Sequence, residues 1–230
     1  MTTIDAPTTT LDVTGAAHAG RRSSGLTSAG GIALLATPVV MAGGMLTIPP
    51  GEDGVTTSSY LGSLAATPWL TGLSAGLLHY SWVLFALGVL AAPGLVRGRG
   101  RVLTGAVAAA MSFCAIQISG LLLGDWYGMA LGRALPLDQA AGIFEAADAN
   151  LWVTTWMYSG KLVGFAGVLL VTAALAWSRA VSWWLVALPV LGTVAMAGLG
   201  MLLGNLGAGI GMIISMAPLF VIGAKLLRQR

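Results

Sequence analysis

One lysine in the sequence lies where a charged group is unexpected. Lys161 stands nine positions after Trp152 inside the apolar stretch 152–177, which is about 14 Å along a helix. If this stretch crosses a membrane, a charge at that depth costs a few kcal/mol and marks a candidate functional site. Tyr158 and Thr154 share its helix face by the 100° spacing of residues. The pattern predicts a polar stripe that could bind an anionic small molecule or lipid, or pair with another membrane protein.

Two other polar side chains occur at a similar depth in neighbouring apolar stretches. His79 lies in the stretch 69–95 and Gln117 in the stretch 102–123. A histidine beside Lys161 could shuttle protons or respond to pH near its ordinary pKa of about 6.5. The simpler alternatives are that Lys161 extends toward the lipid headgroups and that His79 only hydrogen-bonds between helices. No acidic residue falls within a predicted span, so Lys161 is expected to lack a buried ionic partner.

The segment 136–148 predicts a short amphipathic helix that begins at Pro136 and carries an acidic face. Asp138, Glu145 and Asp148 fall within an arc of about 80° on this helix. Three carboxylates could attract a hard cation such as calcium. Because their spacing does not resemble a ligand loop, a solvated face is the favoured interpretation and no metal site is predicted.

The sequence lacks the residues that most catalytic and cofactor chemistries require. The sequence contains no His-Glu-x-x-His motif and no phosphate-binding glycine loop, and Cys114 is its single cysteine. His18 and His79 are too far apart to suggest a pair of haem ligands from the apolar stretches. We therefore expect no catalytic residues and no cofactor, and an enzyme is the least favoured class.

The elements that position these residues are predicted from composition and apolar length. Hydrophobic residues make up 57% of the 230 residues and charged residues only 8%, against about 25% charged in soluble domains. A lipid bilayer is therefore the expected surrounding medium. A bilayer crossing needs about 20 apolar residues, which predicts an all-α integral membrane bundle of about six helices, arranged as three hairpins. The expected parts are a flexible tail at 1–29, an outer loop at 125–150, and a transmembrane domain at 30–227 with spans at 30–48, 69–95, 102–123, 152–177, 180–200 and 206–227.

Basic residues predict the orientation of these spans. The arginines at 97, 99 and 101 join the second and third spans, Arg179 joins the fourth and fifth, and Arg21, Arg22 and Lys225 flank the first and last. Since short cytoplasmic loops retain Lys and Arg, both termini are predicted to be cytoplasmic. The protein itself is expected in the cell membrane. The scattered charges give no reason to expect a nucleic-acid partner.

These features leave the function open between two main classes. Transport or ligand passage is weakly favoured, because Lys161, His79 and Gln117 would form a polar cluster in the outer half of the bundle. The alternative is an accessory, sensor or assembly subunit that uses its helices to bind other membrane proteins. Substrate, partner and oligomeric state do not follow from the residues.

Overall fold

The computed structural model describes the backbone of residues 13–51 and 56–229, and this part of the chain is helical with no strand. Side chains are described for residues 25–51, 56–161 and 166–229. In chain order the elements are α1 (Val13–Leu46), α2 (Thr57–Ala66), α3 (Pro68–Val89), the 3-10 turn η1 (Ala92–Leu95), α4 (Arg101–Leu121), α5 (Leu123–Ala134), α6 (Leu137–Asp148), α7 (Leu151–Trp177), the 3-10 turn η2 (Trp183–Val186), α8 (Ala187–Leu203) and α9 (Asn205–Leu227).

Five helical segments are long and apolar enough to cross a membrane, and α7 makes a sixth if its two halves form one span. The axes of Leu151–Lys161 and Ala166–Trp177 are inclined by 46°. Each of the six segments overlaps one predicted span, which confirms the helical class and the count of five to six candidate spans.

The first helix is longer than the sequence suggested. α1 begins at Val13, so residues 13–29 of the predicted flexible tail are helical. Among the residues whose side chains are described, the part of α1 that is apolar enough to cross a membrane is Gly25–Leu46. The rest of the predicted tail, residues 1–12, lies outside the described residues. The segment from Val13 onward is polar but rich in alanine, which favours a helix without requiring an apolar face.

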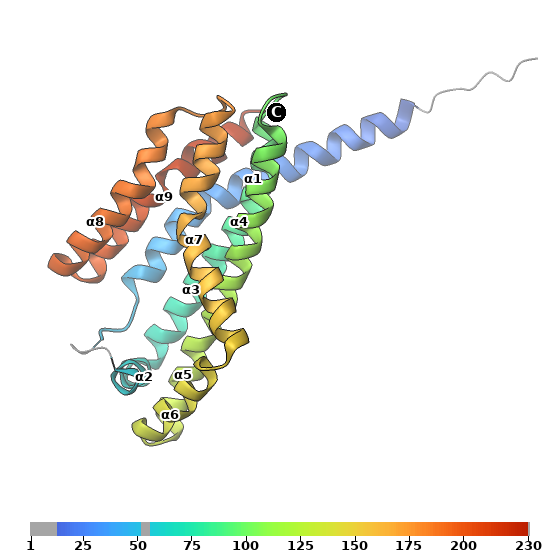
Figure 1. The fold of residues 1–230 in the computed structure, drawn as a ribbon. Helices are drawn as coiled ribbons and strands as arrows, with labels where there is room; N and C mark the ends of the chain where they lie inside the picture. The colour runs from blue at the N-terminus through green and yellow to red at the C-terminus, as the bar shows by residue number, and fades with distance from the viewer. Residues whose placement is uncertain (1–12, 52–55, 230) are drawn as a thin grey trace, which may run out of the picture.

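The long helices pack in the spatial order α8, α9, α1, α3, α4, α7 (Figure 1). The extensive contacts include α1 with α3, α4 with α7, and α8 with α9, so helices that follow one another as spans pack as pairs. α1 also packs along α9, whereas α7 touches α8 and α9 only slightly. The core of the assembly contains fully buried large side chains from several helices, among them Leu34, Phe85, Leu175, Leu219 and Ile222.

Glycine permits the closest of these contacts, between α8 and α9. A Cβ on Gly192 would overlap the backbone of Ser215, and a Cβ on Gly211 would overlap the backbone of Met196. The turn between the two helices passes through Gly204, whose φ of +57° lies in the left-handed region. Close approach through small residues is a common way to pack helices that gain nothing from hydrophobic burial in lipid.

Three short helices form a cap at one end of the bundle, shown at the lower end of Figure 1. α2 packs on α5 and α6, around a small apolar cluster formed by Leu61, Ala140 and Ala141. α4 and α5 together give a candidate span of 34 residues, about 51 Å long at 1.5 Å per residue. A hydrocarbon core of about 30 Å cannot contain that length, so α5 is expected to continue beyond it.

Basic residues gather at the end of the bundle opposite the cap. The ammonium of Lys225 donates to the carbonyl oxygen of Ala180 at 2.7 Å, and the Arg99 guanidinium lies 5.7 Å from the centre of the Trp177 ring. These contacts bring the C-terminal end of α9 and the connections before α4 and after α7 together.

Candidate functional site

The cap positions a tyrosine against a carboxylate. α2 begins with a capping box in which Thr56 and Ser59 bond each other's backbone N–H groups, and this fixes the start of the helix that carries Tyr60. The Tyr60 hydroxyl donates a hydrogen bond to the carboxylate of Asp125, in the first turn of α5. Burial raises the pKa of Tyr60 far above its usual value, and the carboxyl groups of Asp125 and Asp148 add to the increase. Tyr60 therefore stays protonated and keeps its role as donor.

Asp125 is an acidic neighbour of Lys161 but not a directly paired one. The positive charge of Lys161 acts through space on the carboxyl group of Asp125, although no ion pair within 4.0 Å occurs among the described residues. The side chain of Lys161 is exposed, and it ends the first half of α7, where the helix changes direction. The proximity of the two residues could not be predicted from the sequence, because Asp125 follows the third predicted span and is 36 positions from Lys161.

His79 lies on α3 and bonds to α4. Its Nδ1 is 2.8 Å from the hydroxyl oxygen of Ser119 and 3.1 Å from the Ser119 carbonyl oxygen. If Nδ1 carries no hydrogen it accepts from the hydroxyl, and if it is protonated it donates to the carbonyl. The ring of Trp126, next to Asp125 on α5, lies 6.3 Å from the His79 ring. His79 thus joins α3 to the base of the cap.

Gln117 bonds to α7 but not to the lysine. The Ser159 hydroxyl donates to Gln117 Oε1 at 3.4 Å, and a Cβ on Gly160 would stand 3.3 Å from the Gln117 Cβ. Among the described residues, none of His79, Gln117 and Lys161 hydrogen-bonds to another of the three. They lie on three different helices near the cap but do not form one bonded cluster.

The other predicted residues have local roles. Thr154 donates to the carbonyl oxygen of Asp148 at 2.6 Å and so ties the start of α7 to the end of α6. Tyr158 is exposed, as Lys161 is. On α6, Asp138 and Glu145 are exposed and Asp148 is half-buried. No group of three His, Cys, Asp or Glu side chains suitable for a metal occurs among the described residues.

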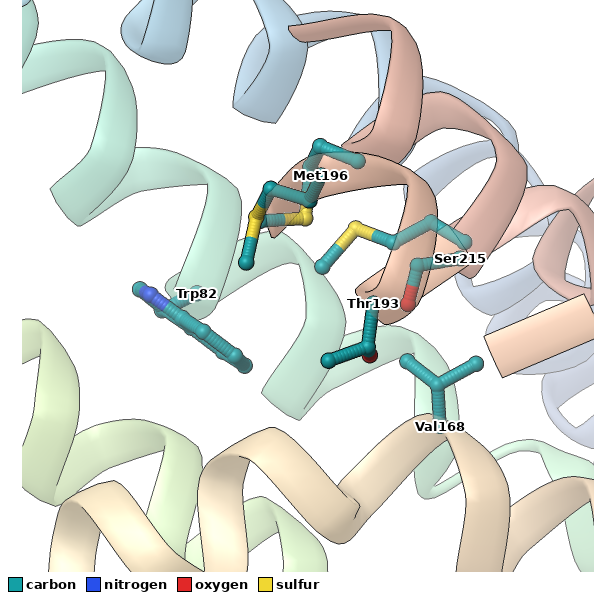
Figure 2. Close-up of a pocket in the computed structure, with 7 residues that line it drawn as sticks. Trp82, Val168, Thr193, Met196 and Ser215 are labelled. Carbon is teal, nitrogen blue, oxygen red and sulfur yellow. The ribbon is translucent and has the colours of Figure 1, made fainter. Parts of the chain in front are cut away.

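A pocket that the sequence did not suggest lies between α3, α7, α8 and α9 (Figure 2). Three methionines, one tryptophan and two hydroxyl side chains supply most of its lining, which consists of Trp82, Val168, Thr193, Met196, Met212, Ser215 and Met216. The only sequence signal was the spacing of Met212 and Met216, which are one helical turn apart.

No family model, curated protein or solved structure matches the chain.

Proposed function

We propose that the chain is a multi-pass protein of the cell membrane with six spans, three hairpins and both termini in the cytoplasm. Supporting this are the apolar length of the helices, the pairwise packing of successive spans, and the collection of basic residues at the end away from the cap. The cap would then lie outside the cell. Single cysteines at Asp138 and at Arg99, in a Cys114→Ser background, test this with a membrane-impermeant maleimide. Labelling of position 99 and not 138 in intact cells would overturn the orientation.

We further propose that the protein binds a small anionic solute or lipid headgroup beside the cap. This binding would be one step in moving that solute or lipid across the membrane. The observation that carries this proposal is Lys161, an exposed ammonium without a direct ion pair among the described residues. Asp125 is near enough to interact with the ammonium through space without contacting it directly. An incoming anion can therefore meet a charge that is already in place.

The test compares three versions of Lys161 in purified protein. Wild type and Lys161→Arg keep the charge, while Lys161→Met keeps most of the side-chain length and loses it. Inorganic phosphate, small carboxylates and vesicles of anionic lipid are screened by thermal unfolding, so that a free anion and a lipid headgroup are distinguished. We expect at least one of these to stabilise wild type and Lys161→Arg but not Lys161→Met.

A matched control is Lys225→Met, since Lys225 is the other described lysine and already bonds to the Ala180 carbonyl. If this variant loses the stabilisation equally, the effect reflects overall charge and the site at Lys161 is wrong. Equal melting of wild type and Lys161→Met under every condition would also overturn the anion site.

The second candidate is an assembly subunit, and it rests on α8. Only 17% of the apolar window of the segment Trp183–Leu203 is buried, the smallest fraction among the five unbroken candidate spans. That segment therefore offers a large face to lipid or to another membrane protein. Crosslinking from Val194, which is 67% exposed, in native membranes would distinguish the two roles. A defined protein adduct favours assembly, and lipid adducts alone count against it.

A further inference from the structure

The methionine pocket combines donor atoms that suit one kind of ion. Met212 and Met216 come from successive turns of α9, and Met196 comes from α8. Met212 and Met216 are almost fully buried, with 5% and 3% of their surfaces exposed. Thioether sulfur is a soft, uncharged donor that selects Cu(I) over hard cations such as magnesium or calcium.

The backbone contacts between α8 and α9 hold these sulfur-bearing side chains together. Gly211 lets the backbone of α9 meet Met196, and Gly192 lets α8 meet Ser215, which lies one residue before Met216. Any larger side chain at either glycine would separate the two helices. The three methionines are therefore supplied by the most tightly packed helix pair of the bundle.

The size of the pocket restricts its occupant. Its volume is about 20 Å³, which is room for about one water-sized group. Organic ligands usually need pockets of about 300–1,000 Å³. A single ion fits this space.

The other lining groups suit a positive charge. None of the seven lining side chains is charged. Trp82, which is 6% exposed, lies at one side of the space in Figure 2, and an indole ring attracts cations to its face. The hydroxyls of Thr193 and Ser215 both donate to the carbonyl oxygen of Pro189, at 2.8 and 3.4 Å, so their oxygen lone pairs remain able to face a cation.

We propose that this pocket binds one soft monovalent cation of the Cu(I) class, through the thioethers of Met196, Met212 and Met216. This inference is independent of the anion site at Lys161. The ion enters without change of oxidation state, and no proton is released because thioethers carry none.

The test uses Ag(I), which has the same charge and softness and does not cycle between oxidation states under these conditions. All proteins carry Cys114→Ser, because the buried thiol on α4 would itself bind silver. Purified full-length protein in chloride-free buffer is loaded with excess Ag(I), desalted and measured by elemental mass spectrometry. We expect about one silver per chain in the parent protein, and about a tenfold lower retained amount or less in Met212→Leu/Met216→Leu.

The control is Met201→Leu, because Met201 lies on α8 and is 86% exposed. We expect this variant to retain the silver of the parent protein. X-ray absorption of the silver-loaded parent gives a second measurement that requires no methionine variant, and sulfur scatterers are expected around the metal. The proposal is overturned if the silver in the parent is surrounded only by nitrogen and oxygen, or if the parent retains no more silver than background. It is also overturned if a folded double variant retains as much silver as the parent, and the methionines would then serve only as core packing.

Discussion

Replacing Tyr60 by Phe should loosen the cap measurably, because it removes the hydroxyl that bonds Asp125 and changes little else. A hydrogen bond to a charged group contributes about 1.5–3 kcal/mol. Each 1.4 kcal/mol is a factor of ten in an equilibrium constant, so local opening of α2 should become about 10- to 100-fold more frequent. The small apolar cluster around Leu61 would remain to hold α2 in place.

The assay is amide hydrogen exchange of the peptide covering α2, with the protein in lipid nanodiscs. Tyr127→Phe is the control, since Tyr127 is also in the cap, on α5, and is 70% exposed. Asp125→Asn completes a double-mutant cycle. In the Asp125→Asn background the Tyr60 hydroxyl bonds a neutral amide, so Tyr60→Phe should lower the opening free energy of α2 by less there than it does in wild type. Exchange of α2 within twofold of wild type in Tyr60→Phe would refute the reasoning, and would mean that apolar contacts alone hold the cap.

Three further outcomes follow from the packing and the pKa of the described residues. Since the folded-state pKa of Tyr60 is raised, its contribution to cap stability is complete below about pH 10 and is lost as the pH rises above it. After correction for the intrinsic pH dependence of amide exchange, α2 should therefore open more often there in wild type but much less so in Tyr60→Phe. Gly192→Ala should destabilise the protein by about 1–3 kcal/mol through overlap with Ser215, whereas Gly198→Ala, with open space around it, should be neutral or slightly stabilising in unfolding titrations. Thr104→Val should raise the unfolding free energy by about 1 kcal/mol, because the Thr104 hydroxyl is buried without a hydrogen-bond partner among the described residues, and a clear loss of stability in Thr104→Val would refute this.

The six apolar segments could be predicted because the bilayer imposes a length and an apolar composition on any crossing helix. The helix over Leu137–Asp148 likewise covers the segment that begins at Pro136 in the sequence analysis. In both cases the signal is local, since it depends on residues within one helix. No contact between distant segments is needed to see it.

Two of the three cap helices, α2 and α5, were not predicted, and their residues show why. α2 is rich in serine and threonine and resembles a loop in composition, although its Thr56 and Ser59 capping pair precedes a short apolar run. α5 falls within the predicted outer loop, because Asp125 interrupts the apolar stretch. The bond between Tyr60 and Asp125 joins positions 65 residues apart, and helix periodicity carries no information about such a pairing.

The position of Asp125 links the proposed anion site to the cap. Its carboxylate accepts from Tyr60 on α2 while the charge of Lys161 acts on it from α7. An anion bound at Lys161 would place a second negative charge near this carboxylate, and the two would compete for the lysine. Binding should therefore change the opening of α2 even though the ligand does not touch it. The same hydrogen-exchange measurement, made with and without a stabilising anion, should show altered α2 exchange in wild type and none in Lys161→Met. Equal exchange in wild type with and without bound anion would show that the site and the cap are independent.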